Sequence, residues 1–233
     1  KDERIFAQYM ADHEEALKVV FDALIHSERS TITSIDEIDA IGHRIVHGGN
    51  YFDSSALITD EVLQKIESLC TLAPLHNPPA LKCIQVCQEL APALPQVAVF
   101  DTSFFQTLPP SAYMYPLPYE LCEKHQIRKY GAHGTSHRYI ANRCAALMDQ
   151  PLEDLKIITC HLGNGCSISA IDHGIAVDTS MGFTPLDGLM MGTRCGAIDP
   201  AIIPFLEEAE GLTPAQINEI MNKKSGLLGV SGI

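Results

Sequence analysis

Six polar clusters along the chain carry the residues whose types and spacing could do chemistry. They occupy residues 42–49, 73–78, 100–104, 130–137, 161–165 and 191–194. Most follow an apolar run, and loops at the ends of strands are where a rigid scaffold usually presents functional side chains. Each cluster offers Arg, Asp, His or Asn, mostly beside glycine, so together they predict one composite site that handles an anion.

Two arginines are candidate anion ligands. Arg44 and Arg194 each stand beside glycines after an apolar run. The planar guanidinium forms paired hydrogen bonds with carboxylate or phosphate, and lysine cannot reproduce that geometry. A surface position is the commoner explanation for a single loop arginine, so each arginine taken alone leaves both interpretations open.

One carboxylate and two histidines stand in similar surroundings. Asp101 follows the apolar run 97–100, where it can form a turn or cap a helix, orient a metal–nucleotide complex, or exchange protons with a substrate. His76 and His133 lie in segments flanked by Pro or Gly. Each histidine is either a structural residue with satisfied hydrogen bonds or a catalytic one.

A glycine-rich turn is expected between two apolar runs at His161, Leu162, Gly163, Asn164 and Gly165. Backbone N–H groups in such a turn can point at phosphate oxygens because no side chain blocks their approach. An ordinary hairpin turn explains the same residues. A P-loop does not, because no Gly-Lys-Ser/Thr follows.

The cysteines and histidines do not predict a metal centre. The eight cysteines contain no C-x-x-C pair, which favours reduced thiols inside a cell. His133 and His137 have the spacing of zinc ligands, but the glutamate of a zinc hydrolase motif is absent from between them. No metal ligand is therefore assigned within this chain.

Apolar periodicity and turn residues predict the elements that must position these clusters. Helices are expected at 11–27, 60–70, 78–90, 136–148, 200–209 and 214–223, with Ser136 as the cap of the fourth. Strands are expected at 38–46 and 97–100, and then as an antiparallel meander at 156–160, 167–171 and 175–177. Residues 225–232 resemble a loop, and the Pro- and Tyr-rich segment 109–118 is the best candidate for a domain boundary.

Composition excludes several classes of protein. The chain has 233 residues, 46% of them apolar, and a formal net charge of -13. That charge argues against nonspecific binding to nucleic acid, which needs clustered Lys and Arg. No apolar stretch approaches a membrane span and no signal peptide opens the sequence. A soluble, cytoplasmic protein that binds neither nucleic acid nor membrane is expected.

From about Ile41 to Gly232 the chain resembles the acetate/propionate/butyrate kinase family. The resemblance rests on stretches in one order along the chain: 42–49, 73–78, 97–102, 130–137, 160–165, 177–182, 184–188 and 191–194. It implies an α/β fold, namely part of the split RNase H-like two-domain fold of the actin/Hsp70/sugar kinase type. Residues 1–103 would be the remainder of the N-terminal domain. Residues 104–233 would be part of the second domain, with a phosphate-binding hairpin.

The same resemblance implies an activity. The family transfers a phosphoryl group reversibly and directly between ATP and a short-chain carboxylate, so acetate would give acetyl phosphate and ADP. It also implies Mg²⁺ as a cofactor, ATP as a substrate and a homodimer. Val46 is a branched side chain that takes the space a longer acyl chain would need, which favours acetate over propionate.

The resemblance also implies roles for individual residues. Three residues would be catalytic. Asp101 would be the acid/base or metal-positioning carboxylate, His133 would stabilise the transition state, and Arg194 would bind the phosphoryl group. The substrate would be held by Arg44, Val46, Leu75, His76 and Pro185. The ATP phosphates would be bound by His161, Leu162, Gly163, Asn164 and Gly165.

Some features depart from the family pattern. Ala197 stands where the family commonly has a carboxylate, and Ala132 stands where relatives can have Phe. The family's early Asn-x-Gly-Ser-Ser-Ser loop and a late metal-binding Glu are not found, so a poorly active fragment without both ends is expected. A propionate kinase, a non-enzymatic member of the superfamily and a metal-dependent hydrolase are the competing interpretations.

Overall fold

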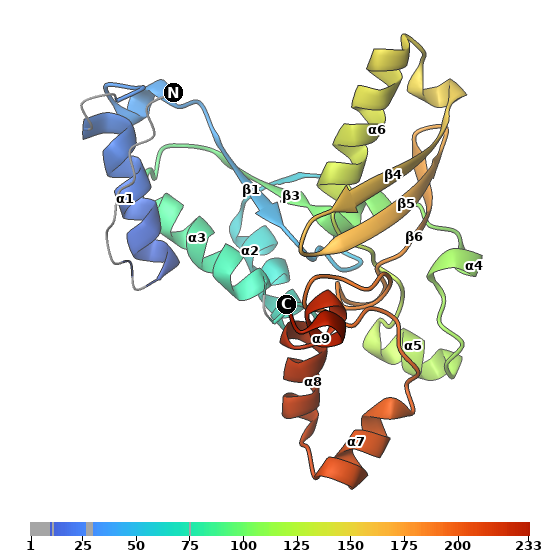
Figure 1. Ribbon diagram of the computed structural model, residues 1–233. Helices are drawn as coiled ribbons and strands as arrows, with labels where there is room; N and C mark the ends of the chain where they lie inside the picture. The colour runs from blue at the N-terminus through green and yellow to red at the C-terminus, as the bar shows by residue number, and fades with distance from the viewer. Residues whose placement is uncertain (1–9, 11, 27–29, 75) are drawn as a thin grey trace. The chain divides into compact units, whose positions relative to one another are not determined.

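The computed structural model describes residues 10, 12–26, 30–74 and 76–233. The chain forms two compact units (Figure 1). The first contains residues up to 45 together with 55–99, and the second contains residues 46–54 and 100–233. A domain division at residue 103 stays a prediction.

Among its described residues, the first unit contains a three-stranded sheet and three α-helices. Its elements are α1 (His13–His26), the 3₁₀ turn η1 (Ile35–Glu37), β1 (Ile41–Ile45), β2 (Ala56–Leu57), α2 (Asp60–Ser68), η2 (Leu69–Thr71), α3 (Asn77–Leu90) and β3 (Gln96–Phe100), whose last residue is counted with the second unit. The strand order is β1-β3-β2, with β2 antiparallel to β3. The strands expected at 38–46 and 97–100 are thus present.

Local sequence explains where these helices begin. Thr59 caps α2 by accepting a hydrogen bond from the backbone N–H of Val62, and α3 carries proline in its first turn. An ion pair between Glu14 and Lys82, 2.7 Å long, joins α1 to α3. The helix expected at 11–27 corresponds to α1, although residues 11 and 27 lie outside the described part of the chain.

The second unit is built on an antiparallel meander covered by a helix. Its helical elements are η3 (Asp101–Phe105), α4 (Pro110–Tyr113), α5 (Tyr119–His125), α6 (Gly134–Met148), η4 (Leu152–Asp154), α7 (Ile202–Glu210), α8 (Pro214–Lys223) and α9 (Gly226–Ser231). The strands are β4 (Lys156–Leu162), β5 (Cys166–Asp172) and β6 (Ile175–Thr179), in the order β4-β5-β6. Figure 1 shows α6 running along this sheet.

The meander follows its turn signals. β4 and β5 pair from Lys156–Asp172 to Leu162–Cys166, around the turn 163–165. The second turn consists of His173 and Gly174, both with positive φ (53° and 82°), so it has two residues rather than the three expected. Positive φ at both positions is what a tight hairpin between twisted strands requires. The predicted antiparallel meander is therefore confirmed.

The core of the second unit lies between the sheet and its helical cover. Side chains on β5 alternate, so that Ser167, Ser169 and Ile171 are buried. An apolar cluster fills the space beneath α6 and η3: Phe104, Phe105, Leu108, Ala141, Ile171 and Ala176. Burying this area holds α6 against the strands.

Two predictions about helices are wrong. Helix α6 begins at Gly134 with His133 as its N-cap residue, so Ser136 lies inside the first turn rather than at the cap. Residues 226–231 form α9 where a loop was expected. Its first N–H groups are not left unpaired, because Leu227 and Leu228 donate to the carbonyl oxygens of Met191 and Gly192.

All eight cysteines are free thiols. Among the residues that the structure describes, no helix is both long enough and apolar enough to cross a membrane.

Candidate active site

A buried carboxylate organises the N-terminus of α6. Asp101 is 0% exposed; its Oδ2 accepts from the backbone N–H of His133 (3.1 Å) and its Oδ1 from the Thr135 hydroxyl (2.9 Å). A negative charge is favourable there because the first N–H groups of a helix are unpaired and the helix dipole is positive at that end. Asp101 therefore caps α6 from 32 residues away and fixes the backbone of His133.

Close packing restricts the backbone where α6 begins. A Cβ atom on Gly134 would overlap the carbonyl oxygen of Asp101 and would lie 2.8 Å from Cβ of Phe104. His133 adopts a left-handed backbone conformation, with φ of 61°. The chain thus turns sharply at His133 and enters the helix only because Gly134 has no side chain.

His133 is held by two neighbours in the second unit. Its Nδ1 lies 2.8 Å from Oγ of Ser167 on β5, and its ring stacks on that of His161 with 4.0 Å between the ring centroids. The Nδ1 atom of His161 in turn lies 3.0 Å from Oγ of Ser136. Two predicted site histidines therefore form one packed pair at the junction of α6 with β4 and β5.

The glycine-rich turn lies against this pair. A Cβ atom on Gly165 would be 3.4 Å from Cε1 of His133 and 3.2 Å from Nη1 of Arg194. Both basic side chains therefore reach the turn at the point where glycine leaves its backbone exposed. Of the predicted phosphate loop, His161 and Leu162 belong to strand β4, and only residues 163–165 form the turn.

Arg194 is anchored at the same turn. Its Nη1 donates to the carbonyl oxygen of Pro185 at 3.0 Å, and partial burial lowers the pKa of its guanidinium. The backbone N–H of Gly192 donates to the carbonyl oxygen of Asn164 (3.1 Å), which ties the segment 191–194 to the hairpin. Helix α9 supports that segment from behind through its bonds to Met191 and Gly192.

The second unit thus brings together Asp101, His133, His161, Gly165, Pro185 and Arg194. Arg44 lies on strand β1 rather than in the loop that follows it, and His76 is the N-cap residue of α3. Both belong to the first unit. Val46 is half-buried in the second unit, and Leu75 lies outside the described residues. The convergence of Arg44, Val46, Leu75 and His76 with the other site residues stays a prediction.

A row of buried hydroxyl groups beneath the site was not predicted from the sequence. Thr159, Ser167, Ser169 and Thr179 are each at most 3% exposed on the inner face of the meander. Ser167 contacts His133, and His137 lies between Ser167 and Thr159. Hydroxyl residues at alternate positions of a strand that faces a core were the signal that could have revealed this row.

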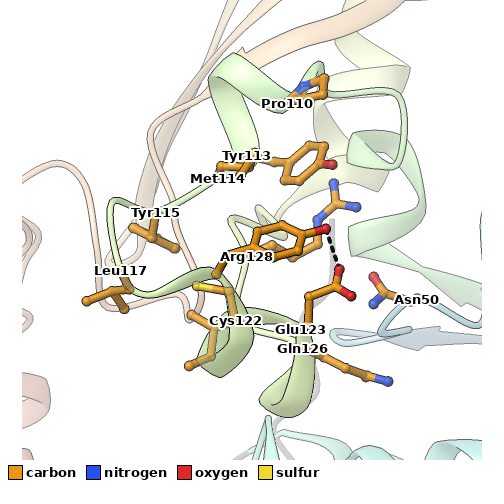
Figure 2. A pocket seen from close by; sticks show the side chains of 12 residues that line it. Asn50, Pro110, Tyr113, Met114, Tyr115, Leu117, Cys122, Glu123, Gln126 and Arg128 are labelled. Carbon is orange, nitrogen blue, oxygen red and sulfur yellow. Dashed lines mark hydrogen bonds between the residues drawn. The ribbon is translucent and has the colours of Figure 1, made fainter.

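A separate cavity of about 400 Å³ opens in the second unit, lined by Asn50 and by residues between 110 and 128 (Figure 2). The Arg128 guanidinium lies 4.1 Å from the centroid of the Tyr113 ring, and Tyr119 donates to Glu123 at 2.8 Å. None of the predicted site residues in the described chain lines this cavity. It is therefore distinct from the His133–Arg194 cluster.

Two buried histidines should make the stability depend on pH. Burial lowers the pKa of His47 and of His137 from 6.5 to about 4. Between those values the unfolded chain binds more protons, so the free energy of unfolding falls as pH drops from 6.5 towards 4. From pH 7 to pH 5 we expect a loss of up to about 2 kcal/mol per histidine.

Urea unfolding at pH 7 and pH 5 measures this loss. His47→Gln should reduce the difference between the two pH values, whereas His125→Gln, at an exposed position of α5, should leave it unchanged. An equal pH dependence in the wild type and in His47→Gln would contradict the assignment to His47.

Comparison with known proteins places the whole sequence in one group. The model of the Acetokinase family matches residues 1–233. The chain is 57% identical over 233 residues to the acetate kinase of Heliobacterium modesticaldum and 58% identical over 233 residues to that of Alkaliphilus metalliredigens. In each case the match covers 100% of this chain and 59% of the relative, so the chain spans about three fifths of their length.

Solved structures of the same family also match this chain. The fold matches a crystal structure of Porphyromonas gingivalis acetate kinase with a TM-score of 0.90 and 50% identity, covering 97% of this chain and 57% of that one. It also matches a propionate kinase from Francisella tularensis with a TM-score of 0.88 and 48% identity, covering 94% of this chain and 56% of that one.

Proposed function

The chain belongs to the acetokinase family, and we propose that the full-length protein transfers a phosphoryl group from ATP to acetate, reversibly, giving acetyl phosphate and ADP. The observation that carries this proposal is the meeting of His133 and Arg194 at the Gly165 turn. The fold is mixed α/β and consistent with the actin/Hsp70/sugar kinase type, as predicted.

Phosphoryl transfer needs positioning and charge stabilisation more than covalent chemistry. In this proposal Arg194 and His133 would donate hydrogen bonds to the equatorial oxygens of the phosphoryl group during in-line transfer. The backbone of the 163–165 turn, exposed through its glycines, would contact the ATP phosphates, with His161 and Leu162 holding the turn at the end of β4. Asp101 would act by positioning His133, because its carboxylate is fully buried and bonded to the start of α6.

The acyl group would be held by Arg44, Val46, Leu75, His76 and Pro185. In this assignment Arg44 pairs with the carboxylate, while Val46, Leu75 and Pro185 surround the methyl group. Pro185 is already beside Arg194 through its carbonyl oxygen. One extra methylene in an apolar pocket changes transition-state binding by about 1–3 kcal/mol, so acetate would be preferred without excluding propionate.

Mg²⁺ would accompany ATP, and it is usually bound through one or two carboxylates, substrate phosphates and water. The described residues contain no group of three His, Cys, Asp or Glu side chains that could hold a metal. Both oxygens of Asp101 accept hydrogen bonds from the protein. We therefore propose no metal ligand among the described residues. A homodimer and a cytoplasmic location belong to the same proposal.

Trapping the acyl phosphate tests the proposed function. The full-length protein, given acetate, Mg-ATP and hydroxylamine, should form acetyl hydroxamate. With propionate in place of acetate, kcat/KM should be lower by about tenfold or more, as expected when one methylene is added to a ligand of an apolar pocket. Reactions without ATP, or without carboxylate, provide the background.

Two other outcomes would change the assignment. A higher kcat/KM with propionate would make the protein a propionate kinase. Nucleotide binding without hydroxamate from either acid would favour a non-enzymatic member of the superfamily.

A further inference from the structure

A line of hydrogen bonds leads from His133 into the core of the second unit. Nδ1 of His133 lies 2.8 Å from Oγ of Ser167, which lies 2.7 Å from Nε2 of His137. Nδ1 of His137 lies 2.7 Å from Oγ1 of Thr159. Ser167, His137 and Thr159 are 0%, 1% and 2% exposed, so water does not supply alternative partners to these atoms.

The number of protons allows only two arrangements of this line. A serine hydroxyl has one hydrogen, so Ser167 donates to one imidazole and accepts from the other. A neutral imidazole likewise has one N–H and one acceptor nitrogen. His137 is neutral near pH 7, because burial lowers its pKa to about 4. Every bond in the line therefore points either towards His133 or away from it.

The terminal threonine distinguishes the two directions. Among the described residues, the Thr159 hydroxyl has one hydrogen-bond partner, Nδ1 of His137. If the bonds point towards His133, Thr159 donates its hydrogen to that nitrogen. If they point away, the nitrogen carries the proton and the hydroxyl hydrogen of Thr159 is buried without an acceptor, which is costly. The direction towards His133 is therefore favoured.

We propose that Ser167, His137 and Thr159 form a relay that holds neutral His133 with its proton on Nε2. In this arrangement Ser167 donates to Nδ1 of His133, so the ring's single N–H is on the nitrogen that faces the Gly165 turn. A Cβ atom on Gly165 would lie 3.5 Å from that Nε2 and 3.2 Å from Nη1 of Arg194. The relay thus presents a neutral donor next to a cationic one.

Charged and titratable groups approach His133 from several elements. His161 stacks on it from β4, Arg194 approaches from the 191–194 segment, and Asp101 accepts from its backbone N–H. One further titratable group nearby in the sequence is the thiol of Cys166, the residue between Gly165 and Ser167. A positive charge on the ring would be opposed by Arg194. A neutral Nε2–H donates to a phosphoryl oxygen without that repulsion.

The role of these residues as positioning groups rests on the proposed kinase function, but the protonation of His133 can be measured without any activity. Nitrogen-15 NMR of histidine-labelled protein at pH 8 distinguishes a protonated from an unprotonated ring nitrogen. We expect His133 and His137 both to carry their proton on Nε2. A proton on Nδ1 of His133 in the wild type would overturn the relay.

Two variants test whether the line sets the tautomer. Thr159→Val removes the terminal donor at nearly constant volume, so His133 should show a mixture of tautomers. Ser169→Ala is the matched control, because Ser169 is also buried on β5 but bonds to Thr179 rather than to a histidine. An unchanged His133 signal in Thr159→Val, with the fold intact by circular dichroism, would show that the relay does not act.

Kinetics of the full-length protein provide an independent readout. Ser167→Ala should lower kcat by up to about tenfold with little change in KM, the size expected for losing one positioned hydrogen bond, and Ser169→Ala should not. An unchanged kcat in Ser167→Ala would refute the positioning role. If the wild type forms no acyl hydroxamate but His133 carries its proton on Nε2, the proposed function fails and the relay stands.

Discussion

Replacing Arg194 with alanine in the full-length protein is expected to lower kcat for acetyl phosphate formation by about a thousandfold. An arginine that stabilises the transferring phosphoryl group contributes about 10³ to 10⁵ in rate in other phosphoryl transfer enzymes. Arg194 is held in place by Pro185 and faces the Gly165 turn together with His133. Arg194→Lys should recover little, because an ammonium group cannot form the same paired bonds.

The controls for this prediction separate chemistry from structure. Arg143→Ala removes an exposed arginine from α6 and should leave kcat unchanged. Because Arg194 also bonds to the carbonyl oxygen of Pro185, a melting curve must show that Arg194→Ala remains folded. Added guanidinium should then restore part of the activity. A loss of less than threefold in Arg194→Ala would remove Arg194 from the catalytic set.

Gly134→Ala is expected to have the largest effect on stability. The new methyl group would overlap the carbonyl oxygen of Asp101, and backbone cannot give way as a flexible side chain can. Relieving that overlap means moving the start of α6 away from η3, which we expect to cost about 2–3 kcal/mol of unfolding free energy, as for other overpacked sites. Because His133 precedes Gly134, activity should be lost even in the molecules that stay folded.

Gly42→Ala is the matched control for this substitution. Gly42 lies on strand β1, and a Cβ atom there would meet nothing within 4 Å. Gly42→Ala should leave the unfolding free energy unchanged or raise it slightly, because alanine restricts the unfolded chain. Urea unfolding measures both variants. Equal unfolding free energies for Gly134→Ala and the wild type would show that η3 and α6 are not packed as described.

The parts of the fold that are determined by residues adjacent in the sequence could be predicted from the sequence. The turns at 163–165 and 173–174 carry Asn-Gly and His-Gly, and they lie where the meander was expected. The start of α6 could not be predicted, because its cap is Asp101, 32 residues earlier in the chain. The same holds for α9, whose first N–H groups bond to Met191 and Gly192.

The candidate site was predictable to a similar degree. His133, His161, Gly165 and Arg194 were each identified from Gly-flanked motifs, and the second unit brings them together. Ser167 and Thr159 were missed because a hydroxyl residue in a strand shows its importance only when its cross-strand and helical neighbours are known. Pattern alone could not show that Asp101 would be fully buried.

The way Asp101 caps α6 also bears on the order in which the second unit folds. The strands β4, β5 and β6 pair residues that are close in sequence, so their loops close at little entropic cost. The bonds from His133 to Asp101 and to Ser167 join residues 32 and 34 positions apart and form only when α6 docks on both η3 and the sheet. A folding intermediate that contains the meander alone would therefore have a complete glycine turn but no positioned histidine. The anion site would be among the last parts of the unit to form.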